Sequence, residues 1–333
     1  RAEGSPVSRI PTGGRFDVCN GDADGLCAVR QWRLHQPAQA VLVTGLKREI
    51  ALLRKVPPER AREVLVCDLS VARNRDALVA LLAAGARVRY FDHHDTAGEL
   101  PASSRLEAHV DTRSGTCTSL LMDRCLGGLH RPWALAGAYG DQMGDVADSL
   151  ARASGLDAGA CATLRRLGEL INYNAYGDSL ADVRLAPREM HALMMRHTDA
   201  FALAREPVFD ELGRQRADDR ARATALTPRL STPQACVLLL PDAAWSRRVA
   251  GSLANELAAA TPRQAQAVLS ARADGGWRVS VRSPRVQARG AAAVCARFGG
   301  SGREAAAGID QLPADALDAF VDAFATAWTA AGS

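Results

Sequence analysis

Short apolar runs alternate with longer stretches of helical periodicity along most of the chain. In the first half, four apolar runs predict strands, at residues 15–20, 41–43, 63–67 and 87–91. The stretches at residues 26–35 and 71–84 have the spacing of amphipathic helices. Strands separated by helices of this length form βαβ units and parallel sheets covered on both faces. We therefore expect an α/β domain with a parallel sheet over residues 15–185.

The second half predicts a helical region followed by another α/β unit. Residues 213–229 are charged and poor in apolar side chains, so we interpret residues 186–233 as a helical linker. Beyond it, strands are predicted at residues 235–240, 266–271 and 277–282, with helices at 245–260 and 286–298. A smaller α/β domain is expected at residues 234–333. Residues 1–14 are rich in Gly, Ser and Pro without periodicity, and we expect them to form a flexible leader.

Composition places this 333-residue chain among globular proteins, with 47% hydrophobic and 23% charged residues. No apolar stretch is long enough to span a membrane and no signal peptide is evident, so we expect a cytoplasmic protein without a membrane partner. The net charge of +4 is only mildly basic, and only Lys47 and Lys55 are lysines among 41 cationic residues, so the number of arginines is weak evidence for nucleic-acid binding. Eight cysteines occur singly, which favours reduced thiols.

Acidic and histidine residues follow three of the predicted strands. Asp22 and Asp24 follow the first strand, Asp68 the third, and Asp92, His93 and His94 the fourth. Because the carboxyl ends of parallel strands meet at one edge of a sheet, these side chains can converge there. Each has a simpler interpretation, since an Asp can cap the following helix and a lone His is usually a hydrogen-bonded surface residue. Together they predict a metal site, and carboxylate with imidazole suits Mn²⁺ or Mg²⁺.

The same residues carry a resemblance to a known family. Four stretches resemble motifs I to IV of the DHH phosphoesterases, namely Asn20-x-Asp22-x-Asp24-Gly25, Val66-Cys67-Asp68, Asp92-His93-His94 and Gly140-Asp141. This family includes RecJ-type single-strand DNA exonucleases, nanoRNases that also act as pAp phosphatases, and cyclic-dinucleotide phosphodiesterases. The resemblance implies a parallel-sheet DHH catalytic domain and a smaller α/β substrate-binding domain that face each other across a cleft.

The resemblance also implies which side chains hold metal. It assigns one Mn²⁺ to Asn20, Asp22 and Asp68, and the other to Asp24, Asp68, His93 and Asp141. Asp68 then bridges the ions, and His94 faces the substrate phosphate. Two such ions can deprotonate a bridging water, so that a metal-bound hydroxide attacks the phosphate in line. The expected catalytic residues are accordingly Asp22, Asp68, His93 and His94.

Three positions leave alternatives open. Asn20 stands where many members have His, and a neutral amide oxygen is a weaker ligand. We expect Asp141 to be the motif IV acid because it directly follows an apolar run, with Asp145 as the alternative. Residues 111–116 precede a predicted helix at 117–126, whose start either binds phosphate or has an ordinary N-cap.

The second domain resembles the DHH-associated substrate domain. Residues 299–308 are similar to its GGGH-x-x-AAG signature, and Arg282-Ser283 match its Arg-Ser pair at a strand end. Arg303 replaces the signature His and is a permanently charged group that can clamp a phosphate. The expected substrate contacts are His94, Arg282, Ser283, Gly299, Gly300, Gly302 and Arg303.

We expect an enzyme that hydrolyses short oligonucleotides, linear dinucleotides or pAp-like nucleotides. After the glycine signature only about 25 residues remain, too few for the OB-fold with which RecJ-type exonucleases hold long strands. A RecJ-like single-strand exonuclease is the alternative among enzymes. A non-catalytic nucleotide sensor is the alternative outside them, supported only by Asn20 and Arg303. Homodimer formation is left open.

Overall fold

A computed structural model describes residues 14–329, so the predicted leader lies outside the described residues apart from Gly14. The chain forms two compact units. Unit 1 comprises the described residues up to Ala175 together with Arg184–Leu212, and unit 2 comprises Tyr176–Val183 and the described residues from Gly213 onwards. These units differ in extent from the segments predicted beyond the leader, whose bounds stay predictions.

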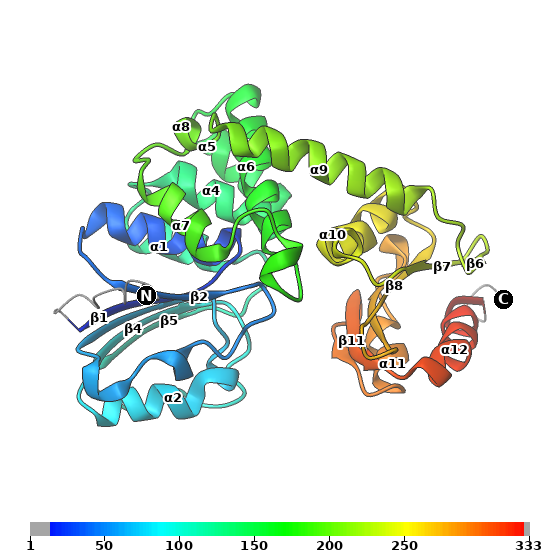
Figure 1. Cartoon of the computed structure of the whole chain (residues 1–333), viewed down its shortest axis with the longest axis horizontal. Coiled ribbons are helices and arrows are strands. Elements are labelled where there is room, and N and C mark those ends of the chain that lie inside the picture. The colour runs from blue at the N-terminus through cyan, green and yellow to red at the C-terminus, as the bar shows by residue number, and fades with distance from the viewer. Residues whose placement is uncertain (1–13, 330–333) are drawn as a thin grey trace, which may run out of the picture. The chain divides into compact units, whose positions relative to one another are not determined.

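Unit 1 is built on a parallel sheet (Figure 1). Its strand order is β2-β1-β3-β4-β5. Its strands are β1 (Arg15–Asn20), β2 (Val41–Gly45), β3 (Glu63–Cys67), β4 (Arg87–Asp92) and β5 (Leu106–Val110). The predicted α/β fold class is thereby confirmed. The sequence does not predict β5, because this edge strand is only partly buried and carries Glu107 and His109 among its apolar residues.

The strand order identifies one edge of this sheet as an expected ligand-binding site. From β1 the chain passes to β2 on one side, and from β2 it returns to β3 on the other side of β1. The carboxyl ends of β1 and β3 are therefore a topological switch point, where ligands bind in sheets of this kind. Asp22 and Asp24 follow β1, and Asp68 follows β3, so the strand order brings these acids to the switch point.

Helices cover both faces of the sheet (Figure 1). The helices of unit 1 are α1 (Ala23–His35), α2 (Val71–Ala83), α3 (Thr118–Cys125), α4 (Arg131–Gly140), α5 (Gly144–Ala153), α6 (Ala158–Ala175), α7 (Pro187–Met195) and α8 (Ala200–Leu203). α2 packs on one face, where Leu78 joins a core with Val66 and Tyr90. The alternate strand residues Cys67 and Phe91 face the other side, which α1 and α3 cover.

Close helix packing brings Asp141 to the edge of the sheet. α4 packs on α6 at Gly168, where an added Cβ atom would lie 1.9 Å from the carbonyl oxygen of Ala136. At Gly140, the last residue of α4, an added Cβ atom would lie 2.3 Å from the Cβ atom of Ala23 in α1. Only glycine fits these two contacts. They hold the end of α4, and Asp141 with it, against the first turn of α1.

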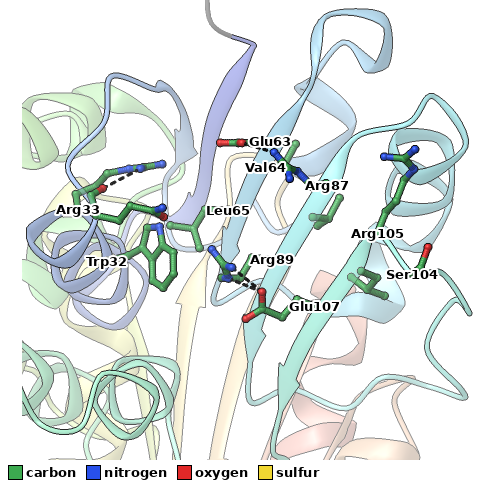
Figure 2. Close-up of a pocket in the computed structure, with 13 residues that line it drawn as sticks. Trp32, Arg33, Glu63, Val64, Leu65, Arg87, Arg89, Ser104, Arg105 and Glu107 are labelled. Carbon is green, nitrogen blue, oxygen red and sulfur yellow. Dashed lines mark hydrogen bonds and ion pairs between the residues drawn. The ribbon is translucent and has the colours of Figure 1, made fainter.

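A cavity of about 360 Å³ opens at the opposite edge of the sheet (Figure 2). It lies at the amino ends of β3, β4 and β5, where Glu63, Arg87 and Glu107 line it. The guanidinium group of Arg89 lies 4.2 Å from the ring centre of Trp32 and pairs with Glu107. The predicted metal ligands follow the other ends of these strands, so this cavity is not the candidate site.

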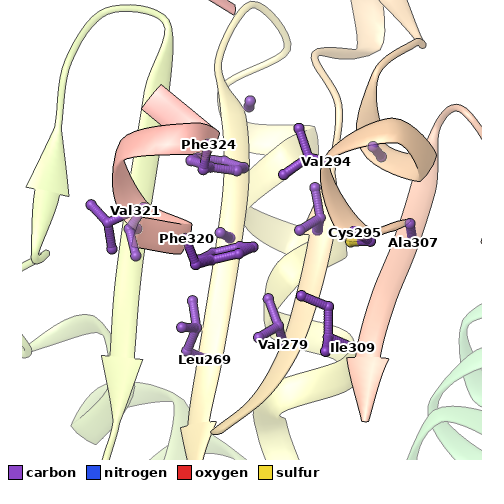
Figure 3. Packing of buried hydrophobic residues seen from close by; sticks show 14 of the residues in the cluster. Leu269, Val279, Val294, Cys295, Ala307, Ile309, Phe320, Val321 and Phe324 are labelled. Carbon is purple, nitrogen blue, oxygen red and sulfur yellow. The ribbon is translucent and has the colours of Figure 1, made fainter. Parts of the chain in front are cut away.

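Unit 2 contains a mixed sheet with the strand order β10-β11-β9-β8-β7-β6, in which β7 and β8 are parallel and the other neighbours are antiparallel. Its strands are β6 (Leu230–Ser231), β7 (Ala235–Leu240), β8 (Ala265–Ala271), β9 (Trp277–Arg282), β10 (Ser301–Gly302) and β11 (Ala306–Leu312). Apolar side chains of the sheet, among them Leu269, Val279 and Ile309, pack against Phe320 and Phe324 (Figure 3). The second unit therefore has its own hydrophobic core.

The remaining helices are α9 (Pro207–Thr224), which begins in unit 1 and ends in unit 2, α10 (Ala244–Ala260), α11 (Ala291–Ala296) and α12 (Leu317–Thr329). The helix predicted at residues 286–298 is wrong in its first part. α11 begins after Gly290, whose φ of 97° is a left-handed conformation that favours glycine. Among the described residues, no helix is both long enough and apolar enough to cross a membrane.

All eight cysteines lie in the described part of the chain and are free thiols, as the sequence predicts. Cys19 and Cys67 are buried and occupy paired positions on β1 and β3. Cys117 is buried directly before α3, whereas Cys125 at the end of that helix is exposed. Several thiols are therefore enclosed in the structure that supports the carboxyl edge of the sheet.

Candidate metal centre

His93 faces three carboxylates at the carboxyl edge of the parallel sheet. Its Nε2 atom lies 3.4 Å from Asp68 Oδ1, 3.8 Å from Asp141 Oδ2 and 3.9 Å from Asp24 Oδ2. Ligand atoms of Asp24, His93 and Asp141 lie within 4.8 Å of one another, as do those of Asp68, His93 and His94. The structure thus brings these predicted site residues together from segments far apart in the sequence.

Asp24 is oriented by the start of α3. From the first turn of α1, its two carboxylate oxygens accept hydrogen bonds from the backbone N–H groups of Thr118 and Ser119, both at 2.7 Å. The hydroxyl group of Thr118 donates to Asp68 Oδ1 at 3.3 Å. The helix start, for which the sequence predicts a phosphate site or an ordinary cap, therefore binds a carboxylate from a distant segment. It orients two of the predicted metal ligands.

The backbone of Asp68 has a left-handed conformation, with φ of 59°. Among residues other than glycine, Asp and Asn adopt this region most readily. The N–H group of Asp68 donates to the carbonyl oxygen of Phe91 at 3.0 Å, which ties the end of β3 to β4. This turn directs a carboxylate that is only 3% exposed toward His93.

Asp141 and His94 are the remaining members of the two ligand clusters. Asp141 directly follows α4, whereas Asp145 lies in the first turn of α5 and belongs to neither ligand cluster among the described residues. His94 is exposed, and its Nδ1 atom lies 2.7 Å from Oδ1 of the buried Asp92. Because Asp92 engages Nδ1, the Nε2 atom of His94 is the one that can meet a substrate.

Asp22 and Asn20 have contacts of a different kind. Asp22 caps α1, because its Oδ1 accepts from the N–H group of Gly25 at 3.0 Å, and its Oδ2 lies 2.5 Å from Nζ of Lys47. Burial acts to raise the pKa of Asp22, but the ammonium group of Lys47 and the hydrogen bonds that the carboxylate accepts together outweigh it, and the pKa lies below its ordinary value. Asn20 accepts from the N–H group of Asp22 at 3.3 Å and donates to the carbonyl oxygen of Lys47 at 3.1 Å. Sequence reasoning misses Lys47.

Comparison with known proteins identifies one domain of this chain and a shared fold. Residues 232–329 match the model of the DHHA1 domain. The fold is similar to that of exonuclease RecJ bound to manganese, with a TM-score of 0.62 and 21% identity, covering 96% of this chain and 91% of that one. Residues 232–329 therefore form a DHHA1 domain, and the chain shares the fold of exonuclease RecJ.

Two further structures share this fold. RecJ from Thermus thermophilus in complex with Mn²⁺ has a TM-score of 0.61 and 20% identity over 97% of this chain, which spans 56% of that protein's length. The pGpG-specific phosphodiesterase PggH from Vibrio has a TM-score of 0.53 and 11% identity, covering 96% of this chain and 99% of PggH. Identities this low show a shared fold. No curated protein sequence matches the chain.

The acids of this candidate site repel one another. Burial raises the pKa of Asp68 well above its ordinary range, and the charges of Asp22 and Asp24 raise it further. Burial, followed by Asp24, raises the pKa of Asp141 to about 6. Burial alone would lower the pKa of His93, but its contacts with Asp68 and Asp24 raise it to about 10. A divalent cation would relieve this repulsion, and carboxylate with imidazole is a donor set that Mn²⁺ accepts, so the residues present fit such an ion.

The substrate contacts predicted in the DHHA1 domain lie in unit 2. Ser283 is buried, and its hydroxyl group donates to the carbonyl oxygen of Ala305 at 3.2 Å. The side chain of Arg282 donates to the amide oxygen of Asn255. Arg303 is exposed directly after β10. Of these three predicted residues, Arg303 therefore presents the most accessible charge.

The predicted glycine loop is a tight hairpin of β10 and β11. An added Cβ atom at Gly300 would lie 2.3 Å from the carbonyl oxygen of Gly308, and Gly302 has a φ of 147°. Gly299 has a φ of 75°. These glycines permit a close backbone turn, and their contact with a substrate stays a prediction.

Proposed function

We propose that this DHH-family protein is a metal-dependent phosphoesterase that acts on short nucleic acids or nucleotides. The observation that carries the proposal is the convergence of carboxylates on His93 at the topological switch point, from Asp24, Asp68 and Asp141. This donor set suits Mn²⁺, with Mg²⁺ as the alternative ion. The solved RecJ structures of the same fold contain manganese, which supports the choice of ion.

The side chains of the site would have two roles, one in holding the metal ion and one in binding the substrate phosphate. When bound, a divalent ion supplies Lewis acidity toward a phosphate oxygen and lowers the pKa of water. Asp24, Asp68, His93 and Asp141 would hold that ion. Asp92 orients His94 through its Nδ1 atom, so that the other ring nitrogen can donate to a phosphate oxygen. The first ion of the predicted pair, on Asn20, Asp22 and Asp68, stays a prediction.

The proposed substrates are short oligonucleotides, linear dinucleotides and pAp-like nucleotides. The pGpG-specific activity of PggH supports a short substrate for this fold. In unit 2, the proposed nucleotide contacts are Arg282, Ser283, Gly299, Gly300, Gly302 and Arg303. A guanidinium group keeps its charge and binds phosphate through two N–H donors, so Arg303 favours a substrate with a terminal phosphate.

A RecJ-like single-strand exonuclease is the second candidate. The higher TM-score with RecJ, 0.62 against 0.53 with PggH, is the observation that favours it. The two candidates share the metal chemistry and differ in the length of the strand that is held. Substrate length is therefore the property that separates them.

A substrate panel tests the proposal. The purified chain is incubated with Mn²⁺ and pAp, pGpG, a short 5′-phosphorylated RNA or a long single-stranded DNA, and the products are separated by anion-exchange chromatography. We expect turnover of the short substrates and its loss in Asp68→Asn, because Asn fits the left-handed backbone but removes a ligand charge. Preference for the long strand would establish the exonuclease. No turnover of any substrate would overturn the proposal in favour of a nucleotide sensor.

A further inference from the structure

We propose that the ammonium group of Lys47 takes the place of one of the two cations that the family resemblance implies, so that the chain holds a single divalent ion beside a built-in positive charge. This inference rests on the proposed function. It concerns Asp22 and Asn20, which are two of the three predicted ligands of the first ion and are both engaged by Lys47.

The carboxylate of Asp22 is occupied at both oxygens. Oδ2 lies 2.5 Å from Nζ of Lys47, and Oδ1 accepts the N–H group of Gly25 at the start of α1. The same ammonium group lies 3.3 Å from the amide oxygen of Asn172 in α6. A divalent ion at Asp22 would have to displace a charged group already in contact with it, because two cations cannot share that position.

Lys47 is held both at its backbone and at its ammonium group. Its N–H group donates to the carbonyl oxygen of Ala175 at 3.0 Å, and its own carbonyl oxygen accepts from Nδ2 of Asn20 at 3.1 Å. Its side chain is 22% exposed. A surface lysine loses rotamer freedom when it forms an ion pair, which makes most such pairs weak. Here both backbone groups of the residue are anchored, and the ammonium group is directed inward to Asp22.

Asn20 holds the backbone of Lys47 through its amide group. Its amide group accepts from the N–H of Asp22 at 3.3 Å and donates to the carbonyl oxygen of Lys47. A carboxylate at this position could not make the second contact, because it has no donor. The side chain that the resemblance assigns to a metal therefore positions the lysine.

Asp141 connects the ammonium group to the remaining ligands. Its Oδ1 lies 4.0 Å from Nζ of Lys47, and its Oδ2 lies 3.8 Å from Nε2 of His93. The carboxylate therefore stands between a fixed positive charge on one side and the ligand set of Asp24, Asp68 and His93 on the other. Lys47 supplies charge at the site without a second ion.

Metal binding without substrate tests the inference. The stoichiometry is measured by equilibrium dialysis with metal analysis, and electron paramagnetic resonance distinguishes an isolated Mn²⁺ from two coupled ions that share a ligand. We expect one isolated Mn²⁺ per chain in the wild type and in Lys47→Arg, which keeps the charge. In Lys47→Met, which is similar in length and uncharged, we expect a second, coupled Mn²⁺ on Asp22.

Two results would overturn the inference. One is a wild-type chain that binds two coupled Mn²⁺ ions. The other is a folded Lys47→Met variant with the stoichiometry and affinity of the wild type. Should that variant not fold, as judged by circular dichroism, the wild-type stoichiometry still decides. If only the proposed function fails, the chain binds one Mn²⁺ but turns over no substrate. If only the present inference fails, the chain binds two Mn²⁺ ions and turns over substrate.

Discussion

The carboxylate of Asp24 in α1 lies 2.7 Å from the backbone nitrogen of Thr118 at the start of α3. Ser119 donates to the same carboxylate, so one buried acid accepts both hydrogen bonds from the start of the helix. The same acid is one of the proposed metal ligands. We expect Asp24→Ala to cost about 1–3 kcal/mol of unfolding free energy, because two buried N–H groups lose their acceptor. Urea denaturation in the presence of EDTA measures this loss. Asp24→Asn keeps one acceptor oxygen and should lose less, and equal losses in the two variants would contradict the role of the hydrogen bonds.

Thr118 positions Asp68 through its hydroxyl group. Removing such a support of a metal ligand typically weakens metal affinity about 10–100-fold. We therefore expect Thr118→Val, which is nearly the same size, to weaken Mn²⁺ binding by that factor, while Thr118→Ser retains it. Titration with Mn²⁺ followed calorimetrically gives the comparison. Unchanged affinity in Thr118→Val would show that the hydroxyl group does not orient Asp68.

Arg303 should affect binding of substrate rather than the chemical step. It is exposed and follows β10 in the DHHA1 domain, far in sequence from the proposed metal ligands. We expect Arg303→Ala to raise KM for a phosphorylated substrate about tenfold with kcat nearly unchanged, because a phosphate contact made equally in ground and transition states affects KM. Arg303→Lys keeps the charge but not the two-donor geometry, so its KM should lie between those of the wild type and Arg303→Ala. An unchanged KM in Arg303→Ala would remove this residue from the proposed contacts.

A buried ion pair lies on the side of the sheet covered by α1. Arg33 donates through Nε to Asp17 Oδ2 at 2.7 Å, and both side chains are less than one-tenth exposed. We expect Arg33→Met to cost about 3–5 kcal/mol, because it leaves Asp17 buried without its partner. The double variant Arg33→Met/Asp17→Leu should recover most of that loss in chemical denaturation. A double variant as unstable as the single one would argue against the ion pair as the cause.

Gly168 should couple helix packing to metal binding. An added methyl group would collide with the carbonyl oxygen of Ala136 and move α4, whose end carries Asp141. We expect Gly168→Ala to cost about 1–3 kcal/mol and to weaken Mn²⁺ binding as well. Gly159→Ala lies in the same helix but meets only the Asp157 side chain, at 3.3 Å, and serves as the control. Destabilisation without loss of Mn²⁺ affinity would show that Asp141 is positioned by other contacts.

Periodicity predicts the bounds of several strands. Those of β1, β3, β7 and β9 follow directly from apolar runs or apolar alternation in the sequence. β5 and β11 escape prediction because Glu107 and His109 interrupt the first, and small residues dominate the start of the second. Exposure at a sheet edge and close backbone packing both weaken the apolar pattern that identifies a strand.

Side chains that follow strand ends could be predicted as site candidates, because the carboxyl edge of a parallel sheet collects them. Asp68 and His93 could be predicted in this way, and the structure brings them together. Lys47 was not, since β2 ends without an acid or histidine, and a lysine in a loop usually lies in solvent. One signal was present, namely that lysine is rare in this arginine-rich chain, but Lys55 shares it and pairs with Glu49 at the surface. Only the fold separates the two lysines.

The enclosed thiols give the structure a chemical reporter that needs no engineering. Cys117 directly precedes the helix start that binds Asp24, and burial raises its pKa well above the ordinary value for a thiol. The thiolate is the form that reacts with alkylating reagents, so Cys117 becomes reactive only when this part of the molecule opens. Exposed Cys125, at the other end of the same helix, provides an internal reference for reagent access. The ratio of labelling at these two positions measures how often the region of the proposed metal ligands opens, in the intact chain and without a substrate.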